Sequence, residues 1–287
     1  MNERSLRLPA PAKLNLMLRV VGRRPDGYHL LQTVFQFIDR LDWISLQDRT
    51  DGEIRLQTPL PGVPEGSDLT VRAARLVKAA TGSERGVDIG VEKNIPMGGG
   101  LGGGSSDAAT VLAGLNILWD CRLSDEQLAR LGLSLGADVP VFLFGRSAWA
   151  EGVGERLAAL DLPESWYVVI VPPCHVSTAE VFASPYLTRA NKPITIGKFV
   201  AGCRENHCVA VVTNMYPLVK EALIDLAKVC GESRLTGTGA CVFGAFCHRQ
   251  EAEGAAKSLR ARWDCFVASS LNRSPLLEAL DMRHLAV

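Results

Sequence analysis

Residues 96–119 read PMGGGLGGGSSDAATVLAGLNILW, a glycine-rich run that leads directly into a segment of strongly helical composition. Because glycine has no side chain to block a polyanion, successive backbone N–H groups in such a run can converge on phosphate oxygens. The unpaired amides at the start of the helix add about 0.3–1 kcal/mol for each nearby anionic group. The stretch therefore predicts a phosphate-binding loop that opens a helix.

Other readings of the glycine run fit less well. The run could instead be a flexible linker or a tight turn without a binding role, but linkers rarely lead straight into an apolar helix. A Walker loop requires Gly-Lys-Ser/Thr, and the run contains no lysine. A Rossmann loop opens an N-terminal βαβ unit with an acidic residue about 20 positions later at a strand end, whereas Asp120 follows a helical segment.

Charge and composition bear on partners and location. Lys plus Arg number 31 and Asp plus Glu number 31, so no net charge draws the chain to nucleic acid or to a membrane. The N-terminal residues lack a signal-peptide core and no run of about 18 apolar residues occurs. We expect a cytoplasmic protein with neither nucleic acid nor membrane as a partner, and a monomer or weak homodimer.

Cysteine usage predicts neither disulfides nor a metal site. Eight cysteines are scattered from Cys121 to Cys265, unlike the dense framework of a small secreted domain. They are expected to be reduced thiols in apolar surroundings. The segment 203–208, with Cys247 and His248 later, has residue types suited to zinc but lacks the paired C-x-x-C spacing.

A chain of 287 residues exceeds the usual size of a single core, so we expect two domains of mixed α+β class. In the first half, the patterns predict strands at 14–20, 34–38, 43–46, 54–58 and 87–91, and helices at 67–80 (capped by Ser67), at 105–119 and after the capping box at Ser124. In the second half, they predict strands at 166–171, 241–246 and 265–268, and helices at 217–229 and 249–262. That order favours a ferredoxin-like second domain, preceded by an irregular connection at 185–206.

Several further segments carry polar residues in a regular setting. The strand at 14–20 alternates, so Lys13 and Asn15 share one face. Residues 24–27, Arg-Pro-Asp-Gly, have turn chemistry, since proline presets one dihedral angle and glycine accepts positive φ. Tyr28 and His29 follow that turn directly.

The glycine run resembles the phosphate loop of the GHMP kinases. PAKLNL at 11–16, RPDGYH at 24–29, GADVP at 136–140, EGVGE at 151–155 and LTGTGA at 235–240 resemble further motifs of that family, in its order. They look most like the branch that acts on a cytidine diphosphate-linked methylerythritol. The resemblance extends from about residue 8 to about residue 275 and is weakest between 185 and 233. It implies an N-terminal ribosomal-S5-like α/β domain over 1–160 and a C-terminal ferredoxin-like domain over 161–287.

The activity that the resemblance implies is ATP-dependent phosphorylation of the 2-hydroxyl of that small molecule, in isoprenoid precursor biosynthesis by the non-mevalonate route. ATP is expected to bring Mg²⁺, with Ser105 or Ser106 near the ion. A GHMP kinase for another small alcohol, of homoserine or mevalonate type, is one alternative. A catalytically silent nucleotide-binding protein is the other, and the presence of both Lys13 and Asp138 argues against it.

Asp138 and Lys13 match the catalytic pair of the family. The neighbours of Asp138 are small or apolar, which could bury its carboxylate and tune its basicity toward a hydroxyl proton. A lysine beside it would keep the carboxylate ionised and counter charge on the transferred phosphoryl group. From the residues alone, Asp138 could equally be a turn aspartate before Pro140, and Lys13 a solvated strand lysine.

The resemblance also assigns the two ligand sites. Lys93 and Met97 flank the loop on the adenine side, while Asp68 stands where the family is expected to have asparagine. Tyr28 and Phe182 would sandwich a pyrimidine that His29 reads; otherwise both would be core aromatics. The expected ATP-site residues are Lys93, Pro96, Met97, Gly98, Gly99, Gly100, Leu101, Gly102, Gly103, Gly104, Ser105 and Ser106. The expected substrate-site residues are Asn15, Tyr28, His29, Thr178, Phe182, Gly237, Thr238 and Gly239.

Overall fold

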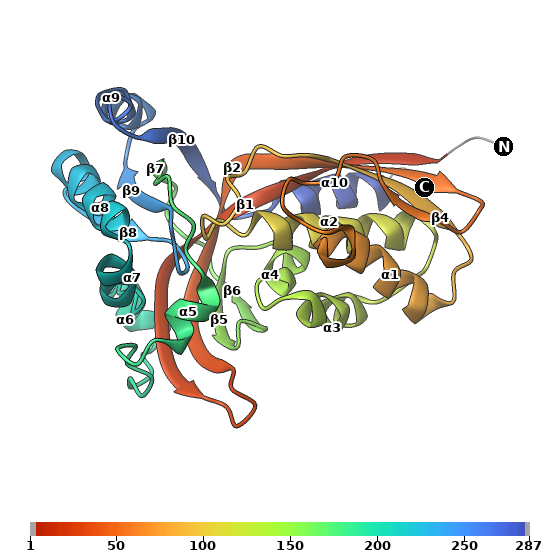
Figure 1. The fold of residues 1–287 in the computed structure, drawn as a ribbon, viewed down its shortest axis with the longest axis horizontal. Coiled ribbons are helices and arrows are strands. Elements are labelled where there is room, and N and C mark those ends of the chain that lie inside the picture. The colour runs from red at the N-terminus through yellow and green to blue at the C-terminus, as the bar shows by residue number, and fades with distance from the viewer. Residues whose placement is uncertain (1–3, 285–287) are drawn as a thin grey trace.

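A computed structural model describes residues 4–284 and shows two halves joined by long strands (Figure 1). The strands are β1 (Ser5–Arg23), β2 (His29–Arg49), β3 (Ile54–Leu56), β4 (Gly86–Glu92), β5 (Ala148–Gly152), β6 (Arg156–Ala159), β7 (Trp166–Val171), β8 (Ser233–Leu235), β9 (Val242–Phe246) and β10 (Asp264–Leu271). The α-helices are α1 (Leu69–Thr81), α2 (Gly103–Leu118), α3 (Asp125–Leu135), α4 (Val139–Phe144), α5 (Thr178–Ala183), α6 (Ile196–Val200), α7 (Val209–Met215), α8 (Pro217–Cys230), α9 (Arg249–Leu259) and α10 (Pro275–His284).

Strand β2 is the spine of the molecule. One edge pairs with β1 along nearly its whole length, and the other pairs in succession with β5, β10 and β4. The two separate strands predicted at 34–38 and 43–46 are one strand, because the polar residues between them form a bulge and not a turn. Pro11 lies opposite Leu41 and Ala12 opposite Ile38, which leaves two extra residues on β2.

The β1–β2 hairpin confirms the predicted turn. Gly27 has a φ of 93°, and its N–H donates to the Arg24 carbonyl at 3.0 Å. The Tyr28 N–H donates to the Asp26 carboxylate at 3.2 Å, the local bond that aspartate commonly makes in turns. Tyr28 and His29 follow directly at the tip of the hairpin, where β2 begins.

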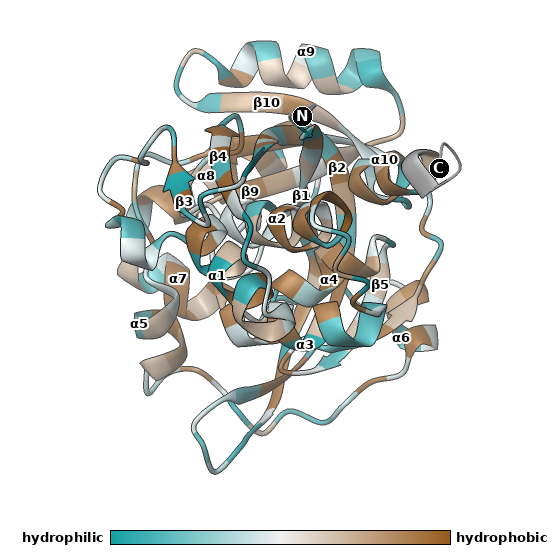
Figure 2. Ribbon diagram, turned by 90° about the vertical axis from the view of Figure 1, so that its right-hand side faces the viewer, coloured by the Kyte–Doolittle hydropathy of each residue, from teal (hydrophilic) through white to brown (hydrophobic). Residues whose placement is uncertain are grey.

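Helices α1 to α4 cover one face of the N-terminal sheet, with α2 innermost (Figure 1). Figure 2 shows α2 apolar and central, in contrast to the polar outer side of α9. A helix that is apolar on all sides is a buried helix. Gly114 allows its close approach, since a Cβ there would lie 2.5 Å from a methyl group of Leu46.

The cap predicted for the helix at 67–80 is wrong by one residue. Ser67 ends a short 3₁₀ turn (Glu65–Ser67), and the N-cap is Asp68, whose carboxylate accepts from the Thr70 N–H at 2.8 Å and from the Val71 N–H at 3.4 Å. The predicted end is confirmed, because Gly82 adopts the left-handed conformation there. The capping box at Ser124 is also confirmed.

The C-terminal half has the predicted ferredoxin-like arrangement. Strands β7, β8, β9 and β10 form an antiparallel sheet in the order β10-β7-β9-β8, and α8 and α9 share one core with its apolar face. The connection at 185–206 is mostly irregular, as predicted, but contains the short helix α6.

The two halves share structure at their junction. Strand β10 pairs with β7 over 264–269 and then with β2 at Ser270 and Leu271. Beyond it, α10 returns to the N-terminal core, where Leu276 is buried. The division after residue 160 stays a prediction, with this last segment crossing back. No helix among residues 4–284 combines the length and apolar character needed to cross a bilayer.

Candidate active site

The glycine-rich loop lies between β4 and α2, with positive φ at Gly98, Gly100 and Gly102 (69°, 77° and 77°). Residues with positive φ alternate with residues with negative φ, which turns successive N–H groups toward one concave side of the loop. Such a concave row of N–H groups suits an anion. The loop therefore has the shape that the sequence predicted for phosphate. Its individual ligand contacts stay predictions.

Close packing also requires these glycines. A Cβ on Gly100 would lie 2.3 Å from the Thr236 carbonyl oxygen, and one on Gly99 would lie 2.4 Å from the Cys241 sulfur. A Cβ on Gly102 would lie 2.7 Å from the Phe142 ring. All six glycines were expected to serve phosphate approach, whereas three of them are also needed because the loop packs against Thr236, Cys241 and Phe142.

Lys13 on β1 is the buried centre of the site, with only 2% of its side chain exposed. Its Nζ donates to Asn15 Oδ1 at 2.5 Å and to the Gly100 carbonyl at 2.8 Å, and lies 3.2 Å from Asp138 Oδ2. These acceptors offset the cost of burying an ammonium group. The alternative that Lys13 is a solvated strand lysine is therefore wrong.

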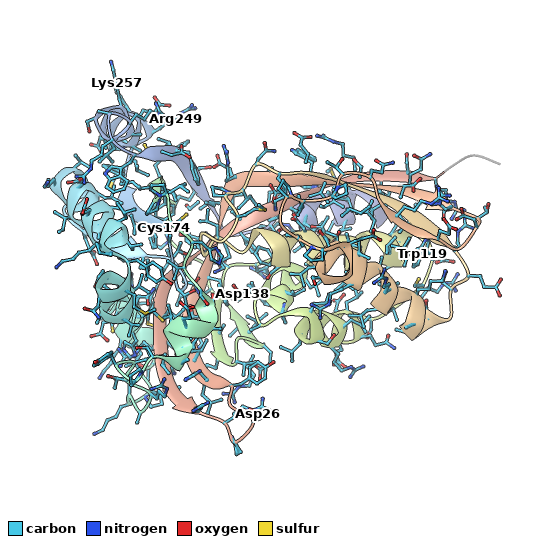
Figure 3. All side chains as sticks on the ribbon, in the orientation of Figure 1. Asp26, Trp119, Asp138, Cys174, Arg249 and Lys257 are labelled. Atoms are coloured by element: carbon cyan, nitrogen blue, oxygen red, sulfur yellow. The ribbon has the colours of Figure 1, made fainter. Side chains whose placement is uncertain are left out.

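Asp138 precedes α4 but makes no side-chain capping bond. Its side chain is 37% exposed, so the expectation of a buried carboxylate is wrong: the lysine is buried and the aspartate opens to solvent. Figure 3 shows Asp138 near the middle of the molecule, where the two halves meet, and Asp26 at the tip of the hairpin. A carboxylate in this position is accessible to an acceptor hydroxyl.

Asn15 lies on the face of Lys13, as its spacing predicted, and both polar atoms of its side chain have partners within the protein. Its Nδ2 donates to the Thr33 hydroxyl at 2.9 Å, which donates in turn to the Met17 carbonyl at 2.5 Å. Its Oδ1 accepts from Lys13. The structure therefore assigns Asn15 a role in orienting Lys13, and its predicted contact with substrate stays a prediction.

The glycine-containing turn at 235–240 is hydrogen-bonded to the glycine-rich loop and to β1. The Thr236 hydroxyl accepts from the Asn15 N–H at 3.0 Å and donates to the Gly100 carbonyl at 3.2 Å. The Cys241 N–H donates to the Gly99 carbonyl at 3.1 Å. The turn thus holds Lys13, Asn15 and the loop in one network.

Two residues with structural roles in this turn were missed by sequence reasoning. Thr236 lies inside the quoted motif, but its hydroxyl partners come from distant segments. Asn206 donates to the Leu235 and Gly237 carbonyls at 2.8 and 2.9 Å and lies in the segment of weakest periodicity. Thr178 and Thr238, both predicted for the substrate side, meet through their hydroxyl groups at 2.8 Å.

A cavity of about 430 Å³ adjoins the loop. Its lining combines apolar side chains, namely Leu60, Val63, Leu69 and Met97, with the backbone of the glycine loop. An apolar slot beside a concave row of amides suits a purine base with its phosphates. Asp68 lines this cavity while capping α1.

Lys93 reaches this cavity with its ammonium group already paired. Its Nζ donates to Asp107 at 2.7 Å and also to the fully buried Asp42. Burial would lower the pKa of Lys93, but the two carboxylates outweigh it and raise the pKa. Burial raises the pKa of Asp107 to about 7, with Lys93 opposing and Asp42 adding to the rise. No local signal predicted this buried cluster.

A second cavity, of about 410 Å³, lies between the hairpin and α5. Tyr28, His29, Thr178 and Phe182 line it, which brings four of the predicted substrate residues together. Phe182 stacks on His29, with ring centroids 4.9 Å apart, and Tyr28 is 61% exposed. The Tyr28 ring is thus available to cover a ligand from outside. The predicted sandwich of a pyrimidine between Tyr28 and Phe182 stays a prediction.

The two cavities are lined by consecutive residues of one segment. Asp138 lines the cavity beside the loop, and its neighbour Ala137 lines the cavity beside the hairpin. Ser106 lies at the start of α2 with a buried hydroxyl that lacks a hydrogen-bond partner among the described residues. Within those residues, no cluster of three or more His, Cys, Asp or Glu side chains is arranged to hold a metal ion.

Comparison with known proteins gives the family. Residues 68–146 match the model of the GHMP kinases N terminal domain, and residues 192–265 match that of the GHMP kinases C terminal domain. A 4-diphosphocytidyl-2-C-methyl-D-erythritol kinase of Methylococcus capsulatus is 59% identical over 99% of this chain and 97% of its own. One of Nitrosococcus oceani is 53% identical over 95% of this chain and 97% of its own.

Solved structures agree with these matches. A crystal structure of 4-(cytidine 5'-diphospho)-2C-methyl-D-erythritol kinase superposes with a TM-score of 0.79 at 35% identity, covering 92% of this chain and 99% of that one. A mevalonate kinase structure superposes with a TM-score of 0.66 at 16% identity, covering 93% of this chain and 100% of that one. The second comparison shows a shared fold alone.

Proposed function

The chain belongs to the GHMP kinases, and on that premise we propose that it transfers the terminal phosphoryl group of ATP to the 2-hydroxyl of 4-diphosphocytidyl-2-C-methyl-D-erythritol. The reaction serves isoprenoid precursor biosynthesis. The observation that carries the proposal is the Lys13–Asp138 pair, whose aspartate lines the cavity beside the glycine loop and directly follows Ala137, which lines the cavity with the aromatic rings.

The chemistry follows from that position. The acceptor hydroxyl oxygen forms a bond to the terminal phosphorus of ATP while the bond from that phosphorus to the bridging oxygen breaks, and ADP leaves. The hydroxyl proton passes to the Asp138 carboxylate. Lys13, whose Nζ lies 3.2 Å from that carboxylate, balances charge on the transferred group, so positioning and electrostatics supply most of the rate.

Mg²⁺ fits the start of α2. Its preferred ligands are oxygens, and the buried Ser106 hydroxyl offers one that is unused by the described residues. We assign Ser106, with Ser105 beside it, to the side of the loop that faces the ion. The chemistry that the ion supplies when bound is neutralisation of charge on the terminal phosphates.

The acceptor is assigned to the hairpin cavity. Tyr28 and Phe182 offer aromatic faces, and a pyrimidine ring gains by stacking on such faces. Gly237, Thr238 and Gly239 lie on the path between this cavity and the phosphate loop, where they would contact the diphosphate.

ADP release tests the proposal directly. The enzyme is mixed with ATP, Mg²⁺ and either the cytidine-containing alcohol, homoserine, mevalonate or galactose. We expect turnover with the cytidine compound only. Turnover with another alcohol and not with this one contradicts the substrate assignment, and ATP binding without turnover of any alcohol supports a silent nucleotide-binding protein.

A further inference from the structure

Arg189 holds the imidazole of His29 from the side of the irregular connection. Its Nε donates to His29 Nε2 at 3.1 Å, and its other nitrogens donate to the carbonyls of Phe182 at 2.8 Å, Ser184 at 2.7 Å and Leu187 at 3.0 Å. Four bonds fix the guanidinium in one orientation. Because a guanidinium can only donate, His29 Nε2 must accept.

An accepting Nε2 determines where the His29 ring carries its proton. A neutral imidazole has one donor and one acceptor nitrogen, so the proton resides on Nδ1. A ring that accepts at Nε2 carries one proton and is neutral. Burial, then Arg189 and then Arg23 lower the pKa of His29, which favours the same neutral form. The stacked Phe182 ring restricts rotation of the imidazole. His29 is therefore held as the Nδ1–H tautomer.

That proton is free for a ligand. Among the residues that the structure describes, none forms a hydrogen bond with His29 Nδ1, and His29 lines the hairpin cavity. The N3 atom of cytosine is an acceptor, whereas the N3 atom of uracil carries a hydrogen. A donor here matches cytosine and opposes uracil.

We propose that Arg189 is a positioning residue that fixes His29 as an Nδ1–H donor and thereby makes the hairpin cavity select cytosine over uracil. The ligand class rests on the proposed function. The tautomer itself does not, because it follows from bonds within the free protein.

His207 supplies an internal reference. Its Nδ1 accepts from the Val20 backbone N–H at 3.1 Å, so its proton resides on Nε2. The Nε2 atom lies 3.5 Å from a Glu205 carboxylate oxygen. His29 and His207 are thus expected to hold opposite tautomers in one molecule.

Nitrogen NMR of the ¹⁵N-histidine-labelled full chain tests the tautomer above neutral pH, with signals assigned by His29→Asn and His207→Asn. In the wild type, we expect the proton of His29 on Nδ1 and that of His207 on Nε2. In Arg189→Ala, the His29 signals move toward the Nε2–H form while those of His207 stay unchanged. A wild-type His29 that carries its proton on Nε2 overturns the proposal.

Binding of CDP and UDP tests the selectivity, with a non-hydrolysable ATP analogue filling the other cavity. We expect Arg189→Ala to reduce the preference for CDP by about tenfold, the value of one hydrogen bond. Arg189→Lys keeps the charge but not the planar fork, so it should lose selectivity too. Arg24→Ala is the control. Arg24 is a cation on the same hairpin and pairs with Asp26, so this variant should keep the preference for CDP over UDP.

Two results separate a structural role from the proposed one. If Arg189→Ala weakens CDP and UDP equally and leaves the His29 tautomer unchanged, Arg189 only braces the loop and the proposal is overturned. If the wild type prefers CDP but releases no ADP with the cytidine-containing alcohol, the proposed reaction is wrong. The proposal that His29 selects cytosine is then still supported.

Discussion

The Lys13 ammonium nitrogen lies 3.2 Å from the Asp138 carboxylate, and the two partners differ in exposure, with 2% of the lysine side chain and 37% of the aspartate side chain accessible. The lysine has no freedom to turn away, since Asn15 and the Gly100 carbonyl also hold it. The aspartate keeps one side open. This asymmetry suits a fixed cation beside a base that must receive a proton.

Asp138→Asn should lower the turnover number by about 10²–10⁴-fold, the usual contribution of a general base. The amide preserves shape, so the dissociation constant of ATP should change little. The measurement is ADP release together with calorimetric titration of ATP. Asp161→Asn, which changes an exposed aspartate paired with Arg146, is the control and should behave as the wild type. Near-normal turnover in Asp138→Asn removes this residue from the mechanism.

Gly100→Ala should destabilise the fold by about 2–5 kcal/mol, because it adds left-handed strain to a clash with the Thr236 carbonyl. Gly62→Ala separates the two causes: its φ of 75° is similar, but a Cβ there meets no atom within 4 Å. That variant should lose only about 1–2 kcal/mol. Urea unfolding of both chains measures the difference. Equal losses would mean that the loop yields at Thr236.

Asp68→Asn should leave the free energy of unfolding almost unchanged, since asparagine caps helices as well as aspartate. Asp68→Ala should cost about 0.5–2 kcal/mol through loss of the cap of α1. The KM for ATP reports separately on any contact with the base. A lower KM in Asp68→Asn, with stability unchanged, would show that the aspartate weakens nucleotide binding relative to asparagine.

Asp107 should make stability depend on pH. Its pKa is raised from 3.8 to about 7, so between these values the folded chain holds a proton that the unfolded chain releases. Its contribution is fully present below pH 3.8 and is lost as pH rises through about 7. The stability of Asp107→Asn relative to the wild type should therefore increase as pH rises from about 4 to about 7.

Urea unfolding of both chains at the two pH values measures this gain. Shifts at His29 and His207 cancel in the comparison, because both chains contain these residues. A difference between Asp107→Asn and the wild type that stays constant with pH would place the titration elsewhere.

Local chemistry explains what could be predicted from the sequence. The turn at 24–27 and the capping box at Ser124 depend on neighbouring residues, and both are present. The choice between Ser67 and Asp68 as cap depends on the direction in which the chain enters α1, which composition does not encode. The polar residues within β2 have the composition of a turn. Asp42, one of them, is nevertheless buried, and its carboxylate accepts hydrogen bonds from Lys93 and from two backbone amides.

The site was predictable only in part. The phosphate loop, Lys13 and Asp138 were found through motifs, because their chemistry needs particular residues at fixed spacing. Arg189 and Asn206 could not be found, since their roles arise from contacts with His29 and with the turn at 235–240, far away in the sequence. The exposure of Asp138 depends on how the two halves meet, which its apolar neighbours did not reveal.

Strand β10 is hydrogen-bonded to β7 along most of its length and to β2 at its end. Any rotation of one half against the other would strain the backbone pairing of Ser270 and Leu271 with β2, so the pairing opposes such a rotation. The distance between the two cavities is then a fixed dimension. The phosphoryl group then crosses a gap whose width is set before either ligand arrives.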